Sequence, residues 1–164
     1  MTVEPERLLG EGPLGDTLPR LLRLFEPERI VPGRATVELD RAEADLRAAT
    51  GRADGARVEP ASPDVTLGAT CRFVRLPANR CLVLLEPATE GRLAAALARH
   101  GEGNVALYLV TQPDGVERVR GAGFALSTSA NGPFGAQRLI LTGPRDGPFL
   151  LLAGLDRQPS TPAP

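Results

Sequence analysis

The stretch RHGEGNVALYLV, residues 99–110, decides how the chain folds. Its first residues end an apolar helical pattern, and Gly101 is a typical helix stop. The run from Val105 to Val110 is apolar and of strand length. The stretch therefore predicts a strand that directly follows a helix.

Apolar spacing and turn residues on both sides of this stretch predict the other elements. Helices are expected where apolar residues recur every three or four positions, and strands where short apolar or alternating runs lie between turn residues. The predicted helices cover residues 18–25, 41–50, 91–100 and 115–121. The predicted strands cover residues 34–39, 65–76, 81–86, 105–110, 124–127, 137–142 and 149–155, with a Gly- and Pro-rich loop at 52–63 and a turn at 143–147. This order repeats a strand-helix-strand-strand unit at a period of about 70 residues, and such internal repeats indicate a duplicated architecture.

Composition limits the classes of protein that the chain can represent. Its 164 residues suit one domain, and 42% hydrophobic residues argue against disorder of the whole chain. The net charge is −1, and the chain has no lysine and only scattered arginines, so no nucleic-acid partner is expected. No apolar run approaches the roughly 20 residues that span a bilayer, and no membrane association is expected. Residues 1–10 lack a secretory pattern, so the prediction is a cytoplasmic protein with reduced thiols.

Two short stretches resemble the vicinal oxygen chelate superfamily, which includes glyoxalases, methylmalonyl-CoA epimerases, extradiol dioxygenases and bleomycin-resistance proteins. One is Leu84-Leu85-Glu86-Pro87, and the other is Arg99-His100-Gly101-Glu102-Gly103 with the strand after it. The resemblance covers about Arg34 to Arg157. It implies an α+β fold in which two βαβββ-type modules form a curled mixed sheet around a concave pocket.

This resemblance also implies a division of the chain into three parts. Residues 1–32 would be an N-terminal extension with a short helix, and residues 158–164 a disordered tail. The vicinal oxygen chelate domain would span residues 33–157, with modules at about 33–100 and 101–157.

Members of this superfamily usually bind a divalent metal through His, Glu or Gln on four strands. By the resemblance, these positions fall here near Gly33–Ala35, on Val83, on Ala106 or Val105, and on Leu151 or Leu152. Apolar side chains cannot replace the water shell of a hard cation, so neither a metal nor another cofactor is expected. His100, Glu86 and Glu102 are interpreted as helix-end, cap and rim residues.

Strand alternation selects the side chains that would line the pocket. If Ala106 points inward, so do Asn104 and Tyr108; if Val83 points inward, so does Cys81. Tyr108 and Glu38 are the candidates for acid–base catalysis. Arg72 and either Arg138 or Gln137 are candidates to face a ligand, the arginines as clamps for a carboxylate or phosphate. The predicted ligand-binding residues are Asn104, Arg72, Arg138, Cys81, Val83 and Ala106.

Three functions remain open from the sequence. The first is metal-independent binding of a hydrophobic, carbonyl-bearing small molecule, such as a natural-product intermediate or a drug, by a homodimer. The second is a cofactor-free isomerase, cyclase or lyase of natural-product biosynthesis that uses Tyr108 and Glu38. The third is a structural partner subunit whose residues 1–32 dock elsewhere.

Overall fold

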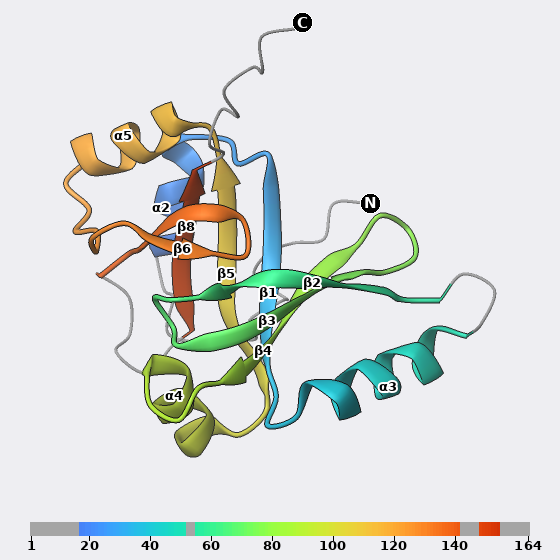
Figure 1. The fold of residues 1–164 in the computed structure, drawn as a ribbon. Helices are drawn as coiled ribbons and strands as arrows, with labels where there is room; N and C mark the ends of the chain where they lie inside the picture. Colours follow the sequence, from blue (N-terminus) through green and yellow to red (C-terminus); the bar gives the residue numbers. More distant parts are fainter. Residues whose placement is uncertain (1–16, 52–54, 142–147, 155–164) are drawn as a thin grey trace, which may run out of the picture.

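The computed structural model describes residues 17–51, 55–141 and 148–154 (Figure 1). The predicted turn at 143–147 and the predicted tail at 158–164 lie outside the described residues, as do residues 1–16 of the predicted extension. The described helices are α2 (Thr17–Leu24), α3 (Leu39–Thr50), α4 (Arg92–His100) and α5 (Pro113–Gly121). The described strands are β1 (Arg29–Ala35), β2 (Arg57–Asp64), β3 (Ala69–Arg75), β4 (Cys81–Pro87), β5 (Gly103–Thr111), β6 (Ala130–Gly132), β7 (Gly135–Leu139) and β8 (Phe149–Gly154).

All eight described strands form one sheet in the order β2-β3-β4-β1-β5-β8-β7-β6. Counted outward from the junction of β1 and β5, each half has its first, fourth, third and second strand in turn. Within each half the first and fourth strands are parallel and the other pairs are antiparallel, and β1 joins β5 in antiparallel register. The two modules are therefore βαβββ units of the same topology, as predicted.

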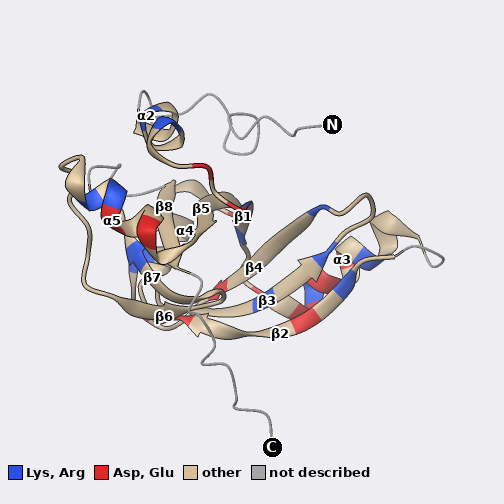
Figure 2. Cartoon of the chain, turned by 90° about the horizontal axis from the view of Figure 1, so that it is seen from above, with Lys and Arg blue, Asp and Glu red and all other residues tan. Residues whose placement is uncertain are grey.

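The sheet curls until its two edges approach each other (Figure 2). Beside the edge strands β2 and β6, the backbone N–H of Val65 donates to the carbonyl of Asn131 at 3.0 Å. The sheet is thus nearly a barrel, with one face turned inward and one face outward. The prediction of an α+β fold with a curled mixed sheet is confirmed.

Apolar side chains on the two faces form separate clusters. The inner cluster combines inward-facing strand residues with two side chains of α4 and one from the turn before β3. Its buried members are Val31, Ala35, Leu67, Ala69, Cys71, Val83, Leu85, Leu93, Ala96, Val105, Ala106, Tyr108, Leu139, Phe149 and Leu151. On the outer face, α2 and α5 cover β5 and β8, while α3 covers β3 and β4. The helix in residues 17–24 therefore packs on its own domain, through the buried side chains of Leu18 and Leu21.

Two strands differ from the prediction because they contain prolines, which disfavour a strand in the sequence pattern. Strand β1 begins at Arg29, and Pro32 lies within it where the register with β4 has not yet begun. The predicted loop at 52–63 contains most of β2, which carries Pro60 and Pro63. Proline cannot donate to a strand ladder, but an edge strand such as β2 tolerates it. The prediction was wrong at both places because proline in a short stretch of sequence favours a loop, whereas the sheet neighbours that tolerate it come from elsewhere in the chain.

In the second module, the bounds of two strands also differ from the prediction. The predicted strand at 124–127 is reduced to one isolated bridge between Leu126 and Ile140, and residues 130–132 form β6 instead. Strand β7 begins two residues earlier than predicted. In the first module, β3 begins only after a turn at residues 65–68. Among the described helices, none is long and apolar enough to cross a membrane.

Candidate functional site

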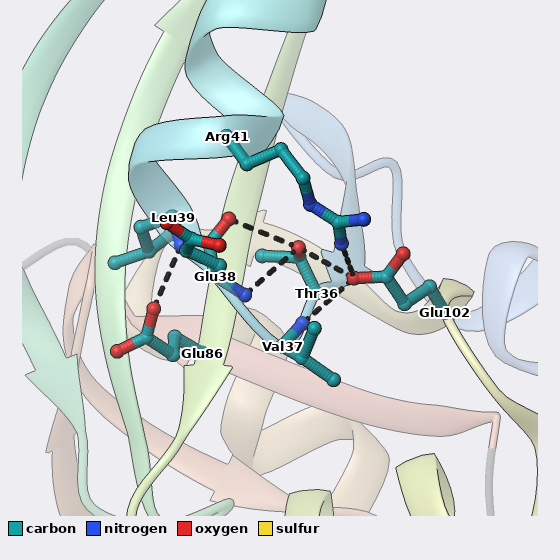
Figure 3. Close-up of polar contacts among 7 residues, drawn as sticks. All are labelled: Thr36, Val37, Glu38, Leu39, Arg41, Glu86 and Glu102. Atoms are coloured by element: carbon teal, nitrogen blue, oxygen red, sulfur yellow. Dashed lines mark hydrogen bonds and ion pairs between the residues drawn. The ribbon is translucent and has the colours of Figure 1, made fainter.

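Two glutamates from the stretches that carry the resemblance hold the start of α3 (Figure 3). Glu86 accepts a hydrogen bond of 2.7 Å from the backbone N–H of Leu39. Glu102 accepts bonds of 2.8 Å from the backbone N–H of Val37 and from the hydroxyl of Thr36. Because hydrogen bonds favour the charged form, the Val37 N–H and then the Thr36 hydroxyl lower the pKa of Glu102. Both glutamates thus have the cap and rim positions that the sequence predicts.

Glu38 lies in the same turn, at the N-cap of α3, and is exposed. Its side chain makes no capping bond, although its backbone N–H donates to the Thr36 hydroxyl at 3.3 Å. The other predicted acid–base residue, Tyr108, is fully buried in β5. The predicted Tyr108–Glu38 pair is therefore not brought together, because β1 ends at Ala35 and leaves Glu38 beyond the strand.

One row of the inner face runs across the four central strands. Gly33 pairs with Val83 on one side and with Ala106 on the other, and Ala106 pairs with Phe149. All four residues are buried. A Cβ added to Gly33 would lie 2.9 Å from the Cβ of Ala106 and 2.9 Å from Leu85 Cδ1, so the strands are closely packed here. Glycine at position 33 permits that close approach.

The residues of this row do not fit a divalent metal. Val83 and Ala106 face inward, and so does Leu151, whereas Leu152 packs in the outer cluster. None of these side chains has an atom that could replace a water ligand. Among the described residues, no three His, Cys, Asp or Glu side chains lie close enough together to hold a metal ion.

Beside the row, three aromatic side chains form a continuous series of ring contacts, called here the aromatic wall: Tyr108, Phe134 and Phe73. Phe134 lies in the tight turn between β6 and β7, and the ring of Tyr108 is 5.4 Å from it, edge-on. The ring of Phe73 in β3 lies 5.8 Å from that of Phe134, also edge-on. Phe73 and Phe134 are partly exposed. Such edge-to-face contacts stabilise aromatic pairs beyond simple burial.

A buried carboxylate, Asp64, anchors the inner end of the aromatic wall. The phenol of Tyr108 donates to Asp64 Oδ2 at 2.7 Å, and the backbone N–H of Leu67 donates to Oδ1 at 2.9 Å. Burial, and then the charge of Asp64, raise the pKa of Tyr108 well above its ordinary value. Burial and Asp64 also raise the pKa of the Cys71 thiol to about 12. Asp64 is not among the predicted site residues because it lies at the end of β2, where the Gly- and Pro-rich sequence predicts a loop.

In the second module the register decides between Gln137 and Arg138. Gln137 is buried on the inner face and its Nε2 donates to Thr66 Oγ1 at 3.5 Å, while its Oε1 has no hydrogen-bond partner in the part of the chain that the structure describes. Arg138 is half-buried and donates to the carbonyl of Ser127 at 2.9 Å. Arg138 pairs with Leu152 of the outer cluster, so Gln137 rather than Arg138 faces inward.

Arg72 also faces outward. Its guanidinium bonds to Asp40 Oδ1 and to Glu43 Oε2, both at 2.6 Å, across a groove of about 530 Å³ between α3 and the β2–β3 strands. Figure 2 shows charged residues of both signs along α3 and these strands. The predicted ligand contact of Arg72 is therefore replaced by two carboxylate partners. Asn104 is exposed at the start of β5, opposite Arg34, and is not part of the inner cluster.

Two arginines flank the remaining predicted residue, Cys81, on the inner face. Arg75 pairs directly with Cys81 in the β3–β4 register. Arg29 lies two residues before the buried Val31 in β1 and so shares its inward face. Burial raises the pKa of the Cys81 thiol, and the charges of Arg29 and Arg75 oppose that rise, so both guanidinium groups act on the thiol. The guanidinium of Arg75 also lies 5.3 Å from the centroid of the Phe73 ring.

Of the predicted site residues, the structure thus gathers Tyr108, Cys81, Val83 and Ala106 on the inner face. It places Glu38, Asn104, Arg72 and Arg138 elsewhere. Five inner-face residues are not among those that the sequence predicts for the site, namely Asp64, Phe73, Phe134, Arg29 and Arg75. Alternation along β3 was a usable signal for Phe73, which shares a face with Cys71.

Comparison with solved structures places this geometry in a known fold. The methylmalonyl-CoA epimerase of Mycobacterium tuberculosis matches with a TM-score of 0.65 and 20% identity, over 84% of this chain and 90% of that one. A Streptomyces coelicolor methylmalonyl-CoA epimerase variant in complex with 2-nitronate-propionyl-CoA matches with a TM-score of 0.62 and 20% identity, over 78% and 96%. A hypothetical protein of Bacillus halodurans matches with a TM-score of 0.59 and 15% identity, over 77% and 93%.

These similarities define the fold of the chain. No protein-family model matches its sequence, and no curated protein matches it either. The chain therefore has the vicinal oxygen chelate fold, as its two short stretches predict, at a level of sequence identity that speaks for the fold alone.

Proposed function

We propose that this protein binds a hydrophobic, carbonyl-bearing small molecule against the aromatic wall, without a metal. The observation that carries the proposal is the placement of the aromatic residues. The chain has six of them, and four belong to the inner face, where Phe73 and Phe134 stay partly exposed. Partly exposed apolar side chains that converge with a few polar groups are the ordinary make-up of a small-molecule site.

The absence of a metal from the proposed mechanism follows from the row that contains Gly33, Val83 and Ala106. Its side chains are hydrocarbon and buried, so they offer no ligand atom to a metal, and the small molecule would contact the partly exposed rings beside the row. The carbonyl group of the ligand is suggested by the likeness to methylmalonyl-CoA epimerases, one of which was solved with 2-nitronate-propionyl-CoA. The ligand's identity as a natural-product intermediate or a drug, the homodimer and the cytoplasmic location stay predictions.

The geometry favours binding over the two alternatives. The phenol of Tyr108 is committed to Asp64 and has a raised pKa, so it is a poor proton donor or base near neutral pH. Tyr108 pairs with Val31 in β1, whereas Glu38 lies beyond the end of that strand, at the N-cap of α3. Glu38 is therefore not placed to exchange a proton with Tyr108. For a partner subunit, the predicted docking helix is already used, because α2 packs on β5, β8 and α5 of its own chain.

The test is a fluorescence titration with the neutral probe N-phenyl-1-naphthylamine. Protein dialysed against EDTA should bind the probe saturably at one site, and added divalent cations should change nothing. A Phe73→Ser variant should weaken binding about tenfold, equivalent to about 1.4 kcal/mol. The matched control is Val58→Ser, because Val58 is also half-buried but packs on the outer face. Absence of saturable binding, or binding that appears only with added metal, would overturn the proposal.

A further inference from the structure

The proposed binding site has a charged end, and this inference, which rests on the proposed function, concerns what that end recognises. We infer that the ligand is a small amphipathic anion whose negatively charged group binds Arg29 and Arg75 while its apolar body lies on the aromatic wall. Three observations support the inference: the contact of Arg75 with the aromatic wall, the guanidinium of Arg29, which is unpaired among the described residues, and the weak ion pair of Arg75.

Arg75 and the aromatic wall are physically continuous. The Arg75 guanidinium lies 5.3 Å from the centroid of Phe73. From Phe73 the ring contacts continue to Phe134 at 5.8 Å and from there to Tyr108 at 5.4 Å. The line therefore runs from an exposed cation to a fully buried phenol. A ligand that follows it would keep its charge near water and bury its apolar part.

Arg29 is available for an anion. It is exposed, and within the described residues its guanidinium makes no hydrogen bond or ion pair. Arg29 lies on the inward face of β1, the face that also carries Val31, and its charge acts on the Cys81 thiol. An arginine that is fixed at its backbone in a central strand but not paired at its guanidinium is ready to bind a carboxylate or a phosphate in bidentate fashion.

Arg75 is only weakly committed. Its partner is Glu59, at 3.3 Å, and both side chains are more than half exposed. Exposed pairs of this kind contribute little to stability and exchange readily for another anion. The contrast is Arg72 on the other face of the same strand, which bonds two carboxylates at 2.6 Å and is mostly covered. The inner-face arginine of β3 is thus the one free to serve a ligand.

The experiment measures displacement of N-phenyl-1-naphthylamine by three molecules with the same ten-carbon chain: decanol, decanoate and decyl phosphate. Decanol should displace the probe, and at least one of the anions should do so at roughly tenfold lower concentration. The anion that gains shows whether the arginines select a carboxylate or a phosphate. Added salt should reduce the gain, because charge attraction is screened.

The variant is the double substitution Arg29→Gln and Arg75→Gln, which should abolish the advantage of the anion and leave decanol unchanged. The charge-matched control is Arg118→Gln with Arg120→Gln, which removes two exposed, ion-paired arginines of α5. If decanol displaces the probe but neither anion gains, or if the gain survives in the double variant, the inference is overturned and the proposed function stands. If neither the probe nor decanol binds, the proposed function itself fails.

Discussion

The two modules share one strand order but bury their outer faces to different extents. In the second module, α2 and α5 cover β5 and β8 with a cluster of ten buried side chains among the described residues. In the first module, α3 covers β3 and β4 with four. The first module adds polar contacts in their place, namely the ion pairs of Arg72 and the glutamates that hold the start of α3. Duplicated topology therefore does not imply duplicated energetics.

The inner faces of the modules also differ, and the difference divides the proposed site. The second module supplies Tyr108 and Phe134, and the first supplies Asp64 and Phe73 together with the two arginines. The second module has the larger apolar anchor, while the first carries the charged end of the site. Four predictions test this division, ordered from the largest expected effect to the smallest.

Truncation of Leu21 to alanine in α2 should cost about 2–5 kcal/mol of unfolding free energy, because Leu21 is fully buried in the larger outer cluster. The same truncation of Leu46 in α3 should cost about 1 kcal/mol, because that side chain is only half-buried. Urea unfolding of both variants measures the difference. Equal losses would contradict the division of the modules into an anchor and a weaker partner.

The Tyr108→Phe substitution should cost about 1–3 kcal/mol, because it leaves a buried carboxylate oxygen of Asp64 without its donor. A double-mutant cycle with Asp64→Asn measures the interaction, and the two single losses should not add. This bond joins the two modules across the interior. Strict additivity would mean that the modules are held together without it.

Stability should fall as the pH rises above 9. The Cys71 thiol has its pKa raised from 9.0 to about 12 in the folded chain, so the unfolded chain loses that proton first. A group whose pKa is higher in the folded chain than in the unfolded chain stabilises the fold at any pH below the unfolded value. This stabilisation is lost as the pH rises from the unfolded to the folded value, by about 1.4 kcal/mol per pH unit for one group. Tyr108 adds to the loss above pH 10. Urea unfolding at pH 8 and pH 10.5 measures this loss of unfolding free energy, which should be smaller for the Cys71→Ala variant. An equal loss in the variant would show that burial does not hold the thiol neutral.

The smallest effect is expected for Arg72→Gln. Its two ion pairs lie at the partly exposed edge of the outer groove, and pairs of this kind contribute about 0.2–1 kcal/mol. Binding of N-phenyl-1-naphthylamine should be unchanged, because Arg72 points away from the aromatic wall. Weakened binding in this variant would move the site to the outer face.

The sequence predicts the parts of the fold that depend on local pattern. The helices at residues 17–24 and 92–100 and the strands β4, β5 and β8 follow from apolar spacing and glycine stops, which act within a few residues. Strands β1 and β2 were misplaced because their prolines are tolerated only by virtue of their neighbours in the sheet. That tolerance is a property of the sheet order and cannot be seen in a short window of sequence.

Much the same limit applies to the site. Alternation correctly placed Val83 and Ala106 on one face with Tyr108 and Cys81, because β4 and β5 were correctly located. It failed for Asn104, because the β1–β5 register shifts between Gly33 and Arg34, and for Glu38, because β1 ends at Ala35. Asp64 and Phe134 reach Tyr108 only because the sheet curls and its edges meet, a long-range event that the residues on either side of them do not encode.

The inner face of the curl is proposed to bind a hydrophobic small molecule without a metal. Amide chemical-shift mapping on ¹⁵N-labelled, EDTA-dialysed protein during titration with N-phenyl-1-naphthylamine locates the binding site residue by residue. The shifts should concentrate on β3, β5 and the β6–β7 turn, around Phe73, Tyr108 and Phe134. Shifts confined to the groove beside α3, around Glu43 and Arg47, would contradict it.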